Sequence, residues 1–155
     1  MPRRSAGILL HRRLDGGEPE VLLVHPGGPF WAKKDAGAWS IPKGEHGADD
    51  DPLTAARREF AEELGRPLPA GEIVPLGEVR QKGGKLVTAW AVAGDLDPAT
   101  IVSNSFELEW PPRSGRRAQF PEVDRAEWFT LDRAREKLLP AQLPLLDRIA
   151  ELIDG

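Results

Sequence analysis

Three glutamates near position 60 are the residues of this chain best suited to chemistry. Glu59, Glu62 and Glu63 lie at the end of the segment Gly44–Gly65, which reads GEHGADDDPLTAARREFAEELG. At about 100° per residue, a helix would place the three carboxylates within an arc of roughly 100°. Carboxylates three or four residues apart on a helix repel one another, by roughly 0.2–0.5 kcal/mol per pair. Converging carboxylates are the oxygen ligands that a hard divalent cation such as Mg²⁺ prefers, so the spacing indicates a metal site.

An apolar stripe lies beside the acidic arc, so one side of the helix can be buried while the other stays acidic. The stripe consists of Leu53, Ala56, Phe60 and Leu64. Asp51 is a suitable N-cap with Pro52 in the first turn, and Gly65 followed by Pro67 stops the helix. The sequence therefore predicts one helix between these start and stop signals.

The segment Gly44–Gly65 resembles the signature of the Nudix hydrolases, G-x5-E-x7-R-E-U-x-E-E-x-G-U, in which U is a bulky apolar residue. The matching residues are Gly44, Arg58, Glu59, Phe60, Glu62, Glu63 and Gly65. An acidic run such as EFAEE, seen alone, is more often a solvated helix face than a site. The other signature residues in the same register favour the site. The resemblance implies a single Nudix hydrolase domain over residues 1–155, with an α/β fold: an α/β/α sandwich with a mixed β-sheet.

Two positions depart from the signature. Asp50 stands where the first glutamate is expected; it keeps the charge but is one methylene shorter, which changes its reach toward a water-bridged metal. Arg66 stands where the last apolar residue is expected, which affects local packing more than chemistry. Asp49 also occupies a turn position where family members often have glycine, which indicates an altered loop.

The resemblance also implies roles for individual residues. Nudix enzymes hydrolyse a nucleoside diphosphate linked to another group, with Mg²⁺ or Mn²⁺ to offset the charge of the phosphates. By resemblance, Glu59 and Glu63 are the leading metal ligands, and Glu62 is a further or water-mediated ligand. The backbone carbonyl of Lys43 is expected to be another metal contact. Arg58 is expected to pair with a carboxylate and hold its rotamer.

An additional acidic residue from outside the signature is expected. Glu122 lies six residues before Trp128, a spacing that resembles the family pattern of a loop glutamate ahead of the last strand. Glu107 and Glu109 would share one face of a strand and are alternatives. The general base stays open among three residues: Glu59, Glu62 and Glu122.

Two basic segments bear on the substrate. The first, GGPFWAKKDAGAW, begins at Gly27 and places two aromatic residues beside two lysines, and an exposed aromatic ring can stack on a base. The second, PPRSGRRAQF, begins at Pro111 and carries three arginines just upstream of Glu122, where outer phosphates could be held. Alternatively, Trp31 packs its own loop and the cations are merely solvated. The candidate substrate-binding residues are Trp31, Lys33, Lys34, Lys43, Arg113, Arg116 and Arg117.

The rest of the chain predicts elements that would hold the acidic helix. Apolar and alternating runs predict strands in residues 5–14, 20–25, 73–81, 85–94, 106–110 and 126–131. A short helix is expected near 132–138 and a second over 143–153, where apolar residues recur at helical spacing. Strands on both sides of a central helix, with a C-terminal helix, indicate a mixed sheet between helices.

Composition fits one ordinary domain. The 155 residues are 40% hydrophobic and 30% charged, and no cysteine is present for a disulfide or a thiolate site. The net charge of −4 argues against a broad basic face for long nucleic acids. No apolar run approaches the ~20 residues of a membrane span. These features fit a cytoplasmic protein that acts away from membranes, and they leave the oligomeric state open. The resemblance implies that its partner is a small nucleotide polyphosphate.

We therefore expect a Nudix pyrophosphohydrolase that acts on a dinucleoside polyphosphate or a nucleoside triphosphate. The sequence PKGE at Pro42–Glu45 resembles the diadenosine polyphosphate hydrolases of the family. The alternatives are cleanup of oxidised nucleoside triphosphates, hydrolysis of ADP-ribose or another nucleotide sugar, and a Nudix module that binds a nucleotide without turnover. Asp50 and Arg66 favour the binding module, whereas the intact glutamates oppose it. No catalytic role is expected for the three histidines, His11, His25 and His46.

Overall fold

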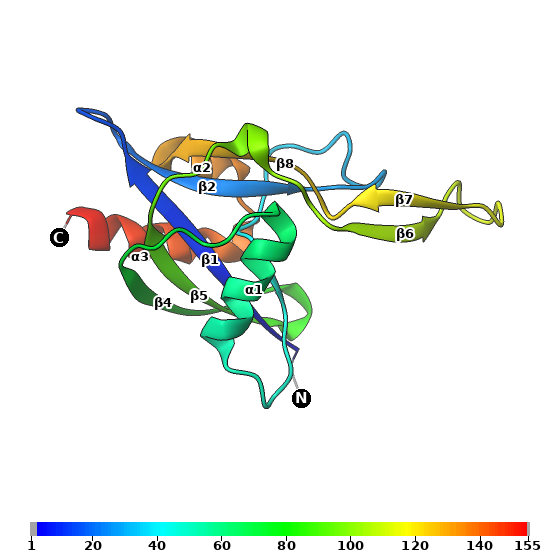
Figure 1. Cartoon of the computed structure of the whole chain (residues 1–155), viewed down its shortest axis with the longest axis horizontal. Coiled ribbons are helices and arrows are strands. Elements are labelled where there is room, and N and C mark those ends of the chain that lie inside the picture. The colour runs from blue at the N-terminus through cyan, green and yellow to red at the C-terminus, as the bar shows by residue number, and fades with distance from the viewer. Residues whose placement is uncertain (1–2, 155) are drawn as a thin grey trace.

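A six-stranded mixed sheet forms the centre of the molecule (Figure 1). The computed structural model describes residues 3–154. The strands run in the order β4-β5-β1-β2-β8, and β3 pairs with β1. Strands β1 and β5 are parallel and the other pairs are antiparallel. Their bounds are β1 Arg4–Arg13, β2 Pro19–Pro26, β3 Lys43–Glu45, β4 Ile73–Arg80, β5 Leu86–Ala93 and β8 Val123–Thr130.

The sheet is buried on both faces, because alternate side chains of its central strands enter two different cores. On β1, Ile8 and Leu10 point to one core and Leu9 to the other, and all three are fully buried. Helix α1 (Pro52–Leu64) covers the first core. Helix α3 (Leu143–Asp154) covers the second, with α2 (Leu131–Lys137) beside it. The structure therefore confirms the α/β/α sandwich with a mixed sheet.

Helix α1 begins and ends at the predicted residues. The Asp51 carboxylate accepts the N–H of Thr54 at 3.1 Å, which caps the start. At the other end, Gly65 adopts the left-handed conformation with φ of 69°, and its N–H donates to the carbonyl of Ala61. Phe60 and Leu64 are fully buried, so the predicted apolar stripe faces the sheet. The acidic arc is left facing away from the core.

Two strands escaped prediction. Strand β3 has only three residues and pairs with β1 through Lys43 opposite Gly7. The end of the second basic segment is not a loop but strand β7 (Arg117–Pro121), paired with β6 (Ser105–Glu109). Its side chains alternate between exposed and half-buried, because Phe120 packs against Phe106 across the pair. The resulting β6–β7 hairpin projects from one side of the sandwich (Figure 1).

The predicted C-terminal helices are confirmed within one or two residues as α2 and α3. Within residues 3–154, none of the helices is both long and apolar enough to cross a membrane.

Candidate functional site

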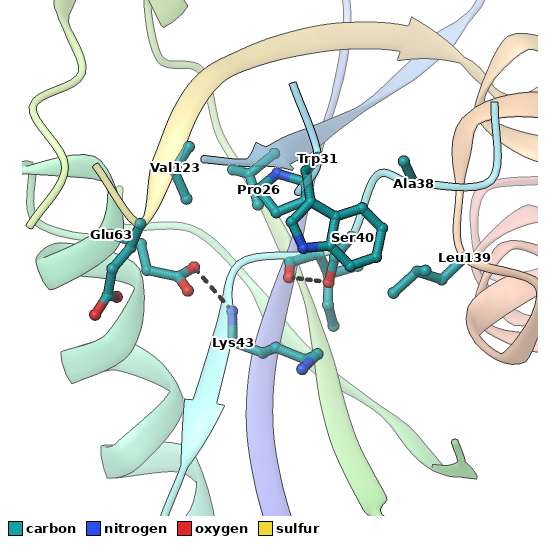
Figure 2. Close-up of a pocket in the computed structure, with 11 residues that line it drawn as sticks. Pro26, Trp31, Ala38, Ser40, Lys43, Glu63, Val123 and Leu139 are labelled. Carbon is teal, nitrogen blue, oxygen red and sulfur yellow. Dashed lines mark hydrogen bonds between the residues drawn. The ribbon is translucent and has the colours of Figure 1, made fainter. Parts of the chain in front are cut away.

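Helix α1 and strand β3 meet at a hydrogen bond. The backbone N–H of Lys43 donates to Glu63 Oε2 at 3.1 Å, as the dashed line in Figure 2 shows. Both residues line a cavity of about 200 Å³. The bond therefore brings the end of the acidic helix to the wall of a cavity. The other lining residues are Val24, Pro26, Trp31, Ala38, Ser40, Ile41, Glu122, Val123 and Leu139.

Burial makes the charged forms of the acidic and basic side chains at this hydrogen bond unfavourable. Burial raises the pKa of Glu63 to about 8; the bond and charge of Lys43 oppose the rise, while the charges of Glu59 and Glu122 add to it. The pKa of Glu59 is also raised, first by burial and then by the charge of Glu62. Burial, followed by the charge of Lys85, lowers the pKa of Lys43. A bound cation would lower the cost of ionising Glu63, because opposite charge favours the carboxylate.

Gly44 leaves space for the carboxylate of Glu59. A Cβ atom at position 44 would lie 2.1 Å from the carboxyl carbon of Glu59, far inside van der Waals contact. Glu59 is 17% exposed, and its Oε1 lies 3.8 Å from the guanidinium of Arg58. This ion pair agrees with the partner predicted for Arg58, although the role of the pair in orienting Glu59 stays a prediction. Glu62 is exposed on the same helix.

The donor atoms match a hard divalent cation in chemical type. The carboxylates of Glu59, Glu62, Glu63 and Glu122 and the carbonyl of Lys43 would offer oxygen alone, as Mg²⁺ and Mn²⁺ prefer. As placed, however, the residues from 3 to 154 contain no group of three or more acidic or histidine side chains close enough to hold a metal ion. Glu59 turns toward Arg58 and Glu63 toward Lys43, and like charges repel. The metal-ligand roles therefore remain predictions.

Among the acidic residues outside the signature, Glu122 lies at the cavity. Its carbonyl accepts the N–H of Gly27 at 2.9 Å, which fixes its backbone beside β2. Glu107 and Glu109 lie on the projecting hairpin instead. Glu107 is 3.4 Å from Arg117, and Glu109 accepts the N–H of Arg113 at 2.9 Å. The placement thus favours Glu122 over the two alternatives.

The first basic segment brings one aromatic residue to the cavity. The indole of Trp31 lies beside Ser40 and Pro26 in Figure 2, and Lys34 Nζ lies 5.1 Å from the centre of its ring. Phe30 points elsewhere: its ring is 59% exposed and packs edge-on against Trp110 of the hairpin. Lys33 is exposed.

The second basic segment is not brought to the glutamates. Arg113 and Arg116 lie in the turn of the projecting hairpin, and Arg117 begins β7 (Figure 1). All three side chains are exposed and none lines the cavity. Their contact with outer phosphates stays a prediction, and it would require a substrate that extends beyond the cavity.

The two departures from the signature have local consequences. Asp50 Oδ2 accepts the N–H of Gly47 at 2.7 Å, so this shorter acid closes the turn before α1. Arg66 is exposed just after Gly65. Neither Asp50 nor Arg66 lines the cavity.

Sequence reasoning missed a buried glutamine behind the cavity. Gln142 is fully buried; its Oε1 accepts the N–H of Ile41 at 3.1 Å and its Nε2 donates to Ser40 Oγ at 3.0 Å. Nε2 also donates to the side chain of Gln81 at 2.9 Å. These bonds hold the segment that leads into Lys43. Gln142 lies 61 to 102 positions from its partners, so no local pattern could have identified it.

The NUDIX domain family model matches residues 1–149. Among solved structures, a C. elegans Ap4A hydrolase in a binary complex is 20% identical with a TM-score of 0.69, covering 97% of this chain and 98% of that chain. The NUDIX domain of Shewanella oneidensis NrtR, complexed with ADP ribose, is 18% identical with a TM-score of 0.67, covering 99% and 89%. The Nudix hydrolase RenU from M. smegmatis is 26% identical with a TM-score of 0.58, covering 97% and 84%. No curated protein matches the sequence significantly. The family match confirms the resemblance drawn from the signature.

Replacing Gly44 with alanine should separate the site from the fold. The added methyl group would displace the Glu59 carboxylate, which is the mobile end of a side chain, so the melting temperature should change by less than about 4 °C. Calorimetric titration should show Mn²⁺ binding at least about tenfold more weakly, roughly 1.4 kcal/mol. Gly17→Ala, in the turn between β1 and β2, is the control. Unchanged Mn²⁺ affinity in Gly44→Ala would remove Glu59 from the metal site.

The raised pKa of Glu63 predicts how stability depends on pH in metal-free buffer. The folded chain holds this proton more tightly than the unfolded chain, so the stabilisation is complete below about pH 4.5 and is lost as pH rises through about 8. At pH 9 with a chelator, Glu63→Gln should melt at least about 2–4 °C above the wild type, since about 1 kcal/mol shifts a domain of this size by that amount. Thermal melts from pH 6 to 9 test this. In Glu62→Gln, which changes an exposed residue of the same helix, the melting temperature should change with pH as in the wild type. If Glu63→Gln also shows the wild-type pH dependence, the raised pKa does not belong to Glu63.

Proposed function

The chain belongs to the NUDIX domain family, and we propose that this pyrophosphohydrolase uses Mg²⁺ or Mn²⁺ to hydrolyse a phosphoric anhydride bond in a dinucleoside polyphosphate or a nucleoside triphosphate. One observation carries the proposal: the hydrogen bond between Lys43 and Glu63 places the end of the acidic helix in a cavity whose other walls hold Glu122 and Trp31. The carboxylates, the lysine and the aromatic ring are the three kinds of group that such a substrate requires.

The proposed metal ligands are Glu59, Glu62, Glu63, Glu122 and the carbonyl of Lys43. A divalent ion, if held by these residues, would neutralise phosphate charge and lower the pKa of a bound water. Lys43 N–H fixes one carboxylate oxygen of Glu63 and leaves the other free to coordinate. Arg58 does the same for Glu59 at longer range. The proton acceptor for the water is one of Glu59, Glu62 and Glu122, each of which has a carboxylate suited to that role.

The volume and the lining of the cavity suit one nucleoside end of the substrate. Its volume of about 200 Å³ is below the roughly 300–1,000 Å³ of most ligand pockets, so it takes only part of a nucleotide. Trp31 and Pro26 give one side an aromatic and apolar wall, whereas Lys43 and Glu63 give the other a charged wall. We infer that a base stacks on Trp31 and that the phosphates extend past Lys43 toward α1. A phosphate near Lys43 would favour its protonated form against the cost of burial.

Two structures of similar fold bear on the substrate class. One is an Ap4A hydrolase and the other is a NUDIX domain complexed with ADP ribose. The sequence PKGE at Pro42–Glu45, which supplies Lys43 to the cavity, supports the dinucleoside polyphosphate. An ADP-ribose or nucleotide-sugar pyrophosphatase is the second candidate. ADP-ribose, like a diadenosine polyphosphate, contains an adenosine linked to at least two phosphates. A module that only binds a nucleotide would gain nothing from the costly burial of Glu63 beside Glu59.

Product chromatography with Mg²⁺ tests the activity directly. The panel contains diadenosine polyphosphates, nucleoside triphosphates, oxidised nucleotides and ADP-ribose. Glu63→Gln should lower kcat at least about 100-fold for whichever substrate is used, the loss of about 2.7 kcal/mol of transition-state stabilisation, while the fold stays intact. Glu107→Gln, on the projecting hairpin, is the matched control and should keep wild-type turnover. Near-wild-type activity of Glu63→Gln would refute the assigned metal site; silence across the panel, with a nucleotide still raising the melting temperature, would favour the binding module.

Trp31→Ala tests the aromatic wall. Loss of a stacked base should raise KM by about 5- to 150-fold, which corresponds to the ~1–3 kcal/mol of base stacking, with little change in kcat. The melting temperature should fall by less than about 4 °C, because Trp31 is half-buried in a loop outside both cores. Steady-state kinetics and thermal melts measure the two effects. A large fall in melting temperature with unchanged KM would support packing of the loop by Trp31.

A further inference from the structure

His25 is a buried polar residue that does not line the cavity, but its two hydrogen-bond partners, Lys34 and Asp124, lie within three residues of Trp31 and Glu122, which do. The imidazole lies near the end of β2 and is 1% exposed. Its Nδ1 atom lies 2.9 Å from Asp124 Oδ1, and its Nε2 atom lies 2.6 Å from the backbone carbonyl oxygen of Lys34. The ring also packs edge-on against Trp39, with ring centres 5.2 Å apart. Both nitrogens therefore have a protein partner, and the ring itself is buried.

The two partners determine which hydrogen bonds the imidazole of His25 can make. A backbone carbonyl can only accept a hydrogen bond, so Nε2 carries a proton and donates it to Lys34. The Nδ1 atom is within hydrogen-bond distance of the carboxylate of Asp124. Removing one partner from a buried hydrogen bond is costly, because the other group is left unsatisfied away from water. The ring thus holds two segments that are far apart in the sequence.

The first segment leads directly to the aromatic wall. The N–H of Lys34 donates to the carbonyl of Trp31 at 2.9 Å, so two hydrogen bonds in series connect His25 to the backbone of Trp31. The Lys34 ammonium lies 5.1 Å from the centre of the Trp31 ring, a second contact between the same residues. The position of the Trp31 ring over the cavity therefore depends on where the Lys34 carbonyl is held.

The second segment carries the acidic wall. Asp124 lies two residues after Glu122, at the start of β8. The N–H of Gly27, two residues after His25, donates to the carbonyl of Glu122 at 2.9 Å. The Asp124 side chain is also 4.0 Å from the guanidinium of Arg125. The Gly27 hydrogen bond thus holds the backbone of Glu122 against the end of β2. The His25 contact holds Asp124, two residues further along the chain.

We propose that His25 is a positioning residue that sets the separation between the Trp31 wall and the Glu122 wall, and so determines how tightly the nucleotide is held. The proposal rests on the function assigned to the cavity. It differs from a role as a packed core residue, for which the edge contact with Trp39 would be sufficient. Because His25 acts through Trp31, removing Trp31 must also remove most of the effect of His25 on substrate binding.

The kinetic test is a double-mutant cycle with diadenosine tetraphosphate, or with the substrate that the panel identifies. His25→Phe keeps an aromatic ring against Trp39 but loses both hydrogen bonds. It should raise KM about tenfold and change kcat less than twofold. His25→Gln retains an amide donor for the Lys34 carbonyl and should recover most of the wild-type KM. In the Trp31→Ala background, His25→Phe should change KM less than about twofold. His11→Phe, a half-buried histidine on β1, is the matched control.

A second test needs no substrate. Hydrogen exchange of the nucleotide-free protein should show amides of residues 31–37 exchanging about tenfold faster in His25→Phe, with α1 unchanged. If His25→Phe does not fold, Asp124→Ala removes the other partner from a side chain that is 35% exposed, and it should raise KM with kcat unchanged. Asp124→Ala should also accelerate exchange in the same loop.

Three results would overturn the proposal: unchanged exchange in residues 31–37, faster exchange spread over the whole sheet, or additive KM effects of His25→Phe and Trp31→Ala. A wild type that turns over nothing in the panel would refute the proposed hydrolysis instead. The exchange experiment and nucleotide-induced melting shifts of the same variants would then still decide whether His25 holds the loop.

Discussion

The hydrogen bond from the Lys43 N–H to the Glu63 carboxylate is the contact on which the site depends. It requires a helix, a short strand and the central strand to meet within a few ångströms. Glycine makes this approach possible: a Cβ atom at Gly7 would lie 2.7 Å from the carbonyl oxygen of Pro42, and one at Gly44 would collide with Glu59. The bond also fixes where the burial cost of a carboxylate falls. Ionised Glu63 is therefore unfavourable without a partner, and a bound cation would stabilise its charged form.

The parts of this arrangement that were predictable from sequence are those with local signals. The caps of α1, its apolar stripe and its glutamates lie within one segment, and their spacing alone specified the helix and its acidic side. Glu122 was predicted because its spacing to Trp128 resembles a family pattern, and it lies at the cavity. Strand β3 has too few residues to show an alternating pattern. The arginines of the second basic segment concealed the alternation that forms β7, whose half-buried face is made by Phe120 and Ala118.

The contacts that complete the cavity could not be read from the chain, because they join distant residues whose types are common. Gln142 reaches Ile41 and Ser40, and His25 reaches Asp124, across separations of about a hundred residues. Both side chains are buried and use their polar atoms fully. Such groups contribute less to net stability than to a single defined geometry, because a shifted loop would leave them unsatisfied in a region of low dielectric. The cavity walls are thus held by polar contacts, while the sandwich is held by apolar ones.

The β6–β7 hairpin and the loop with Trp31 lead to residues that line the cavity, and both are separate from α1 and β3. The last strand of the hairpin runs directly into Glu122, and the rings of Phe30 and Trp110 touch between the hairpin and the loop that ends at the cavity. The groups proposed to cleave the anhydride, in contrast, belong mainly to α1 and β3. Insertions, deletions or substitutions in the turn of the hairpin and in the loop can therefore alter the groups around the cavity while leaving the glutamates of α1 and the backbone of β3 in place. Selectivity can evolve in this molecule independently of reactivity.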